Sequence, residues 1–258
     1  MDVGPGMDIA LAALASLFAG GIDAIVGGGG LILVPALFLV YPTAPAATLL
    51  GTNKVAALAG TTVSAARFSR AITLDWGALL PALLLAALGA LAGAWTLSVV
   101  DTAWLRKALP LVLVALLAYT WVNKQLGVEH APVGSMRQRR LILAAVAVTI
   151  GFYDGLFGPG TGSFFIFALV RLIGFDFLHA SAYAKVLNIA TNAAALFMLA
   201  QRGMVWWQVG AVLAAANIAG SVIGSALAIR WGPRFVRAVF LLVVLALIAR
   251  TGYSAYFA

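Results

Sequence analysis

The sequence lacks cysteine altogether, and charged residues make up only 9% of its 258 positions. The absence of cysteine excludes disulfides, thiolate chemistry and cysteine-ligated metals. A water-soluble domain carries about 25% charged residues to cover its surface, and this chain cannot do so. Because 64% of the residues are hydrophobic and the mean hydropathy is +1.06, lipid must surround most of the exterior. The composition therefore predicts an all-α polytopic membrane protein.

No lysine or arginine precedes Lys54, so the sequence also lacks the basic n-region of a secretory signal peptide. We therefore expect the first apolar run to remain as a membrane span. The formal net charge of +8 comes from basic residues scattered singly or in short groups between apolar runs. This pattern is typical of loops that follow the positive-inside bias, and it does not indicate a nucleic-acid partner.

Apolar runs separated by short polar breaks predict about ten helical elements. Their expected ranges are 8–26, 30–40, 46–66, 76–98, 103–121, 140–157, 161–173, 178–200, 206–229 and 234–251. The second and seventh are only about 11 to 13 residues long, which is too short to cross roughly 30 Å of hydrocarbon at 1.5 Å per residue. We expect these two to be half-helices or arms of re-entrant hairpins.

Two glycine-rich stretches interrupt apolar runs that would otherwise form continuous helices. The first covers 27–30 and follows Asp23, and the second covers 158–163 and follows Asp154. A break at membrane depth exposes backbone amides that lipid cannot satisfy, so it survives only where it lines a cavity or meets a ligand. We therefore expect a binding site between the two breaks.

A constant shift of 131 positions relates the two halves, since it aligns Asp23 with Asp154 and Lys54 with Lys185. Without a gap, the same shift aligns Gly27 with Gly158, Gly29 with Gly160, Trp76 with Trp207, Gly89 with Gly220, Gly93 with Gly224 and Arg106 with Arg237. A register kept over about 85 residues indicates an internal duplication. We predict a first membrane repeat at 1–122, a cytoplasmic linker at 123–139 and a second membrane repeat at 140–258.

Each predicted repeat holds five elements, an odd number, so the second repeat should lie upside down relative to the first. With a cytoplasmic linker, the inner face would collect Arg67, Arg70, Lys124, Arg137, Arg139, Arg140, Arg171, Arg230, Arg234 and Arg237. The outer face would keep Arg106, Lys107, Arg202 and Arg250. This asymmetry favours inverted repeats with both termini outside. The glycine pairs four residues apart, 89 with 93 and 220 with 224, predict close helix packing.

Lys54 and Lys185 lie well inside apolar runs, where a lysine costs about 2.5–3.5 kcal/mol or more, so both need partners. Three roles are open to them. They face an anion beside the glycine-rich helix starts, which we favour, or they snorkel to an interface, or they pair with Asp23 or Asp154. For the two aspartates we favour capping of the break or pairing with a lysine over proton transfer.

Polar residues share the helix faces of the two lysines. Positions 181, 185, 188 and 192 follow i, i+4, i+7, i+11 spacing, and this polar stripe should face the bundle interior as cavity lining or as helix–helix glue. For Thr61 the two roles stay equally open. The candidate substrate ligands are Lys54, Lys185, Asn188, Asn192, Thr52, Asn53, Gly28, Gly29, Gly30, Gly160, Thr161, Gly162 and Ser163, and the candidate proton-coupling or capping groups are Asp23 and Asp154.

The motifs resemble a known family. Gly-Gly-Ile-Asp at 20–23, running into four glycines and followed by Gly-Thr-Asn-Lys at 51–54, is similar to the signature of the TauE/SafE sulfite-exporter family. Positions 158–162 and 184–188 resemble its second half, and the likeness covers nearly the whole chain. The resemblance implies a multi-pass carrier of the bacterial inner (plasma) membrane that moves sulfite or organosulfonates such as sulfoacetate, commonly outward. Tyr183 and Ala184 replace the Thr-Asn pair of the first half, so a shared pocket would not be symmetric.

We therefore expect a secondary transporter of a small sulfur-containing anion that works by alternating access between inverted repeats. No Gly-x-x-x-x-Gly-Lys-Ser/Thr motif is present, so this chain does not energise transport with ATP, and we expect no cofactor and no metal. The expected partners are the anionic substrate and the lipid bilayer, and the sequence leaves homo-oligomerisation open.

Two other classes of protein stay in view. An anion channel, or a permease for another small oxyanion, would share every feature named so far. A remote alternative is an intramembrane serine hydrolase that uses Ser163. A nucleophilic serine needs a base within hydrogen-bond reach, and both histidines of the chain, His130 and His179, are expected in loops.

Overall fold

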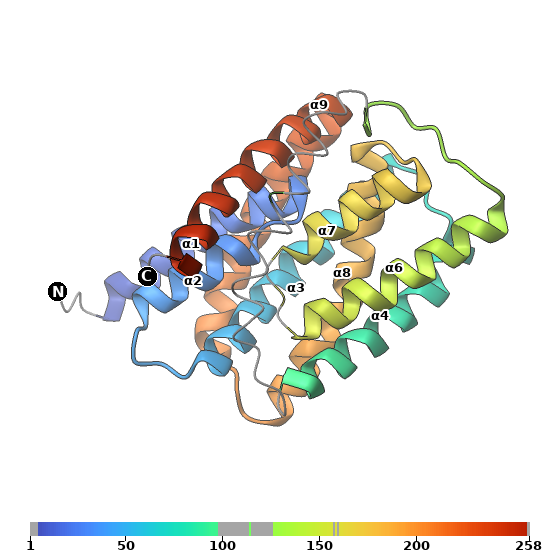
Figure 1. Cartoon of the computed structure of the whole chain (residues 1–258). Helices are drawn as coiled ribbons and strands as arrows, with labels where there is room; N and C mark the ends of the chain where they lie inside the picture. The colour runs from blue at the N-terminus through green and yellow to red at the C-terminus, as the bar shows by residue number, and fades with distance from the viewer. Residues whose placement is uncertain (1–4, 98–113, 115–125, 157, 159, 257–258) are drawn as a thin grey trace.

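The computed structural model describes residues 5–97, 114, 126–156, 158 and 160–256, and all regular structure in these ranges is helical (Figure 1). The helices are α1 (Pro5–Val26), α2 (Gly30–Val40), α3 (Ala46–Ala71), α4 (Trp76–Leu97), α6 (Met136–Leu156), α7 (Thr161–Ala168), the π-helix η1 (Leu169–Ile173), α8 (Phe177–Gln201) and α9 (Trp207–Tyr256). The predicted all-α class is confirmed. The element predicted at 103–121, with Arg106 and Lys107, lies outside the described residues.

The two short elements form where they were predicted, each directly after a glycine break. Helix α2 is 11 residues long, and α7 has 8 residues before it runs on into η1. Helix α9 covers the last two predicted elements and is broken at Gly232, with φ 72° and ψ −168°. The next residue, Pro233, has no backbone N–H and cannot continue the hydrogen-bond ladder of the preceding helix, so it contributes to this break. The chain reverses its direction at this point (Figure 1).

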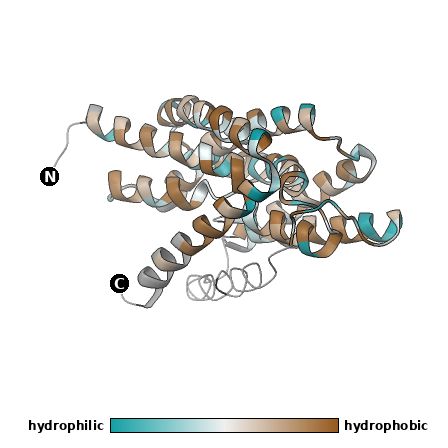
Figure 2. Ribbon diagram, turned by 90° about the horizontal axis from the view of Figure 1, so that it is seen from above, coloured by the Kyte–Doolittle hydropathy of each residue, from teal (hydrophilic) through white to brown (hydrophobic). Residues whose placement is uncertain are grey.

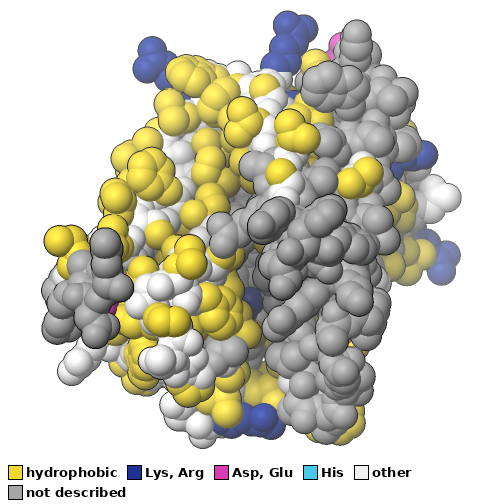
Figure 3. Space-filling view, turned by 60° about the vertical axis from the view of Figure 1, so that its left-hand side comes forward, with side chains coloured by type: hydrophobic (Ala, Val, Ile, Leu, Met, Phe, Trp, Pro, Cys, Tyr) yellow, Lys and Arg dark blue, Asp and Glu magenta, His cyan; other side chains and the backbone are white. Residues whose placement is uncertain are grey.

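The surface is that of a membrane protein. Among the described helices, four segments are long and apolar enough to cross a membrane: Met7–Val26, Trp76–Thr96, Phe177–Gln201 and Trp207–Leu245. Large apolar side chains on them face outward, for example Leu84 at 69% exposure. Brown, apolar residues follow the helices in Figure 2, and hydrophobic side chains cover much of the left-hand part of the face in Figure 3, with lysine and arginine mostly at the edges of the face. Such a surface is stable only in lipid.

Small residues let α4 approach α6, and α9 approach α1, with backbones in contact. A Cβ atom would overlap a carbonyl of the partner helix at each of four glycines: Gly89 with Val148, Gly93 with Phe152, Gly220 with Leu17 and Gly224 with Gly21. Adding 131 to position 89 gives Gly220, and subtracting 131 from position 148 gives Leu17, so the contact of Gly89 with Val148 corresponds to that of Gly220 with Leu17. Swapped contacts of this kind are what a two-fold relation between two halves produces. They support the predicted duplication, while the orientation of the repeats in the bilayer stays a prediction.

Candidate substrate cavity between the two helix breaks

The two helix breaks meet in the interior of the molecule. Gly27 and Gly158, which the shift of 131 relates, have φ values of 75° and 87°, a region that side-chain-bearing residues avoid. A Cβ atom at Gly27 would overlap the backbone of Gly162, and one at Gly162 would overlap Gly27. Glycine is therefore required both to turn the chain and to let the breaks touch.

Each of the two lysines pairs with the aspartate of the opposite half. Lys54 Nζ lies 3.2 Å from Asp154 Oδ1 and 3.1 Å from Oδ2. Lys185 Nζ lies 3.3 Å from Asp23 Oδ2. The two pairs exchange places under the shift of 131, as the helix contacts do. Ion pairing, one of the three roles considered for these lysines, is thus present at both positions.

The two lysines nevertheless differ in their surroundings. Lys185 is fully buried, and its ammonium also donates to the backbone carbonyl of Asp23. Two neighbouring serines cap the same end of α1, since Ser163 Oγ donates to the Val26 carbonyl at 2.8 Å and Ser181 Oγ to the Ile25 carbonyl at 3.1 Å. A cation and hydroxyl donors stabilise the unpaired carbonyls at a helix C-terminus. Lys185 therefore holds the end of α1 in place.

The aspartates satisfy the groups that the breaks release. Asp23 Oδ1 accepts a hydrogen bond from the N–H of Gly29 at 3.2 Å, and its Oδ2 accepts one from Thr61 Oγ1 at 3.3 Å. Asp154 Oδ1 accepts a hydrogen bond from Thr161 Oγ1 at 2.7 Å. Both carboxylates thus combine capping or local hydrogen bonding with lysine pairing, the roles favoured for them, and Thr61 serves one of them.

A cavity of about 50 Å³ lies where the breaks meet. Of the residues proposed from the sequence, it is lined by Asp23, Gly30, Asn53, Lys54, Asp154, Gly160, Thr161, Gly162, Asn188 and Asn192. The sequence-based site omitted Val34, Leu50, Ala57, Gly27 and Gly158, which also line it. The repeat alignment already contained a signal for the two glycines, whereas the three apolar residues look like any other core position.

Five proposed ligands do not line this cavity. Lys185 and Ser163 cap α1, and Gly29 donates its N–H to Asp23. Thr52 Oγ1 donates to the Thr48 carbonyl at 2.7 Å and accepts from the N–H of Trp206 at 3.0 Å, so it joins α3 to the start of α9. Gly28 faces Ile22 and Val243 instead. In this structure these residues support the cavity wall from behind.

One polar group at the cavity wall lacks a partner. Asn188 is 5% exposed, and its Oδ1 atom is buried without a hydrogen bond among the described residues. A buried acceptor left unsatisfied costs about 1–3 kcal/mol. A water molecule or a polar ligand that donates to this oxygen would recover that cost, and a half-turn of the amide would present its NH₂ group to an anion instead.

The geometry gives the hydrolase alternative no support. Ser163 Oγ is fully buried and donates to a backbone carbonyl of α1. The two histidines lie with Asp176, His130 in the linker and His179 in the first turn of α8, which corrects the expectation that His179 falls in a loop. In the described part of the chain, no hydrogen bond joins Ser163 to a histidine.

These observations define a polytopic membrane protein with a polar, charged cavity between two broken helices, the architecture of a transporter. Comparison with known proteins agrees: the sulfite exporter TauE/SafE family matches residues 12–251, and the chain belongs to this family.

The chain is similar to proteins from three bacteria that are named probable membrane transporters. A "Probable membrane transporter protein" of Haemophilus influenzae is 35% identical, with 96% of this chain and 98% of that protein covered. The "Probable membrane transporter protein ORF9" of a Sinorhizobium species is 34% identical, with 94% of each covered. The "Probable membrane transporter protein YfcA" of Escherichia coli K12 is 32% identical over 93% of this chain and 88% of its own length. No solved structure gives a significant match.

Proposed function

We propose that this protein exports a small sulfur-containing anion, sulfite or an organosulfonate such as sulfoacetate, through the cavity between the two breaks. The observation that carries the proposal is the position of Lys54. Its side chain is 11% exposed, and it lines a cavity whose other walls include five glycines and three asparagines, together with the carboxylates of Asp23 and Asp154. An ammonium, amide dipoles and unhindered backbone are the groups that bind an oxyanion at membrane depth.

An anion would take Lys54 from Asp154. The carboxylate keeps its hydrogen bond from Thr161 Oγ1, so it retains a partner when the ammonium turns to the substrate. Gly30 and Gly162 lie in the first turns of α2 and α7, where backbone N–H groups lack an intrahelical acceptor and the helix dipole is positive. These groups would hold the oxygens of the anion, while Asn188 and Asn192 orient it.

The size of the cavity favours a small substrate. One water needs about 10–15 Å³ of such space, so a cavity of about 50 Å³ holds a group no larger than a few waters. Sulfite fits this limit better than sulfoacetate does. An inside-negative membrane potential drives an anion outward by about 2.3 kcal/mol per charge for each 100 mV, which favours export. Rocking of one half against the other would expose the cavity to each side in turn.

The proposal is tested by flux of labelled sulfite and sulfoacetate in proteoliposomes. We expect Lys54→Ala to abolish most of the flux, whereas Arg202→Ala, which removes an exposed basic residue between α8 and α9, leaves it unchanged. Unchanged flux in Lys54→Ala would remove this lysine from the mechanism. Acceleration by unlabelled substrate on the far side distinguishes a carrier from a channel, and its absence would favour the channel.

A further inference from the structure

The linker and the start of α8 bring together both histidines of the sequence. His130 lies in the linker, His179 lies in the first turn of α8, and Asp176 is the N-cap residue of that helix. Asp176 Oδ2 is 2.6 Å from His179 Nδ1 and 3.5 Å from His130 Nδ1. The potential ligand atoms of all three side chains lie within 4.8 Å of one another. Two imidazoles and one carboxylate therefore lie close enough together to bind one ion after small side-chain adjustments.

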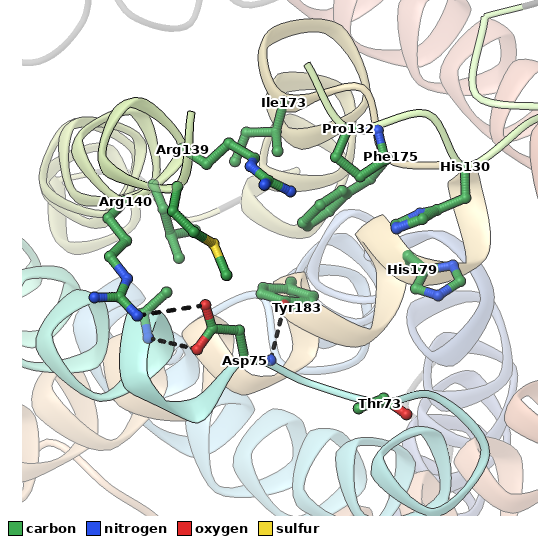
Figure 4. Close-up of a pocket in the computed structure, with 13 residues that line it drawn as sticks. Thr73, Asp75, His130, Pro132, Arg139, Arg140, Ile173, Phe175, His179 and Tyr183 are labelled. Atoms are coloured by element: carbon green, nitrogen blue, oxygen red, sulfur yellow. Dashed lines mark hydrogen bonds and ion pairs between the residues drawn. The ribbon is translucent and has the colours of Figure 1, made fainter. Parts of the chain in front are cut away.

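This cluster borders a second cavity, of about 280 Å³. Figure 4 shows the two imidazoles close together at one end of it, on the far side from Arg140. Their ring centroids are 3.8 Å apart, and their side chains are 34% and 27% exposed, whereas that of Asp176 is only 7% exposed. An ion can thus reach the imidazoles from the cavity, while the carboxylate is held in place.

The equivalent positions of the first half carry no such residues. The shift of 131 places Pro45 and Thr48 of the first half at the positions of Asp176 and His179. Helix α3 begins at Ala46 with Pro45 as its N-cap residue and without either ligand type. In α8, capping is fulfilled by Asp176 Oδ1, which accepts the N–H of His179 at 2.7 Å. Asp176 Oδ2 does not take part in this cap and faces the two imidazoles instead.

We propose that His130, Asp176 and His179 form a binding site for a first-row transition-metal dication of the Zn²⁺ or Co²⁺ type. Imidazole nitrogens together with one carboxylate suit these ions, whereas Mg²⁺ and Ca²⁺ prefer oxygen ligands throughout. In a tetrahedral site with bonds of about 2.0–2.2 Å, ligand atoms stand about 3.3 Å apart. The 3.5 Å separation of His130 Nδ1 and Asp176 Oδ2 already fits, and the 2.6 Å separation of His179 Nδ1 and Asp176 Oδ2 has to widen for the ion to enter.

Metal ions bind the neutral form of imidazole and the ionised form of a carboxylate, so an ion that enters this cluster would displace protons from it, and binding should weaken at acidic pH. A bound ion would join the linker to α8, the helix that carries Asn188 of the substrate cavity.

The test uses the full-length protein in detergent, purified with a histidine-free affinity tag and stripped with EDTA. We expect one equivalent of Zn²⁺ to bind and to raise the Tm by several degrees, Mg²⁺ to have no effect, and Co²⁺ to give visible ligand-field absorption. A wild-type protein that binds neither Zn²⁺ nor Co²⁺ stoichiometrically would overturn the proposal, whatever its transport activity.

Two variants separate coordination from packing. His130→Phe keeps the ring against Phe175, and Asp176→Asn keeps a good N-cap residue, so both should fold. Each should weaken Zn²⁺ binding at least about tenfold. Asp75→Asn, in the same cavity but outside the cluster, should bind Zn²⁺ as the wild type does. Undiminished binding in His130→Phe would contradict the assignment, and if neither variant folds, the Co²⁺ spectrum of the wild type decides.

Discussion

The ion pair between Lys54 and Asp154 should be strongly coupled energetically, and a double-mutant cycle can measure it. Their side chains are only 11% and 3% exposed, with a closest N–O distance of 3.1 Å. Breaking a buried pair from one side typically costs about 3–5 kcal/mol because a charge is left without a partner, and replacing both members is often nearly neutral. We expect Lys54→Met and Asp154→Asn each to cost about 3 kcal/mol, and the double variant about 1 kcal/mol.

The assay is reversible unfolding in mixed micelles, with the coupling free energy calculated from the four proteins. The exposed pair of Arg140 and Asp75 is the matched control, because its N–O distance is 3.9 Å and its side chains are 54% and 33% exposed. Exposed pairs contribute roughly 0–1 kcal/mol. A coupling for the buried pair no larger than that of the control would refute the reasoning.

The same double variant also tests function. It should fold, since no buried charge is left unpaired, yet it should not move sulfite because the ammonium is gone. Flux at the wild-type rate through this folded protein would show that the substrate does not use Lys54.

Three further outcomes follow from the structure. Gly27→Ala should destabilise the protein by several kcal/mol more than Gly203→Ala. Both glycines have positive φ (75° and 69°), but only Gly27 lacks room for a Cβ atom. Equal losses of stability in thermal unfolding would contradict the contact between the breaks. Asn188→Leu removes an unpaired buried oxygen, so stability should stay level or rise by about 1 kcal/mol while sulfite flux falls; retained flux would exclude this amide from the site. Lys185→Met should lower the Tm more than Lys54→Met, because Lys185 is fully buried and its ammonium also donates a hydrogen bond to the backbone carbonyl of Asp23. A larger loss of Tm in Lys54→Met, measured in detergent, would disprove the capping role of Lys185.

Much of the fold could be predicted from the sequence because lipid imposes simple rules. The start and end of α2 and the start of α4 agree with prediction, since glycine, proline and polar residues interrupt the apolar runs there. The break at Gly232 was predicted as a gap between two elements for the same reason. The pairing of Lys54 with Asp154, 100 positions away, was only one of three open roles. The energetic cost of burying a lysine shows that it needs a partner, but it does not identify that partner.

The parts that sequence could not provide depend on packing of distant segments. The repeat alignment suggested equal roles for Lys54 and Lys185. In the structure Lys185 instead caps the C-terminus of α1, where two serines of the second half donate to neighbouring carbonyls. The histidine cluster was missed because His130 stands 46 and 49 positions before Asp176 and His179 and meets them only when the linker folds back on α8. Local spacing carries no information about such a contact.

The swapped glycine contacts have a consequence for biogenesis. The small-residue face of α1 is covered by α9, and that of α4 by α6, so neither face of the first half has its partner until the second half is made. When only α1 to α4 of a nascent chain have been inserted into the bilayer, the helix faces that make the closest contacts in the finished protein are therefore still unpacked. Helix α4 gains its partner once α6 is made, whereas the small-residue face of α1 stays uncovered until the ribosome has made α9.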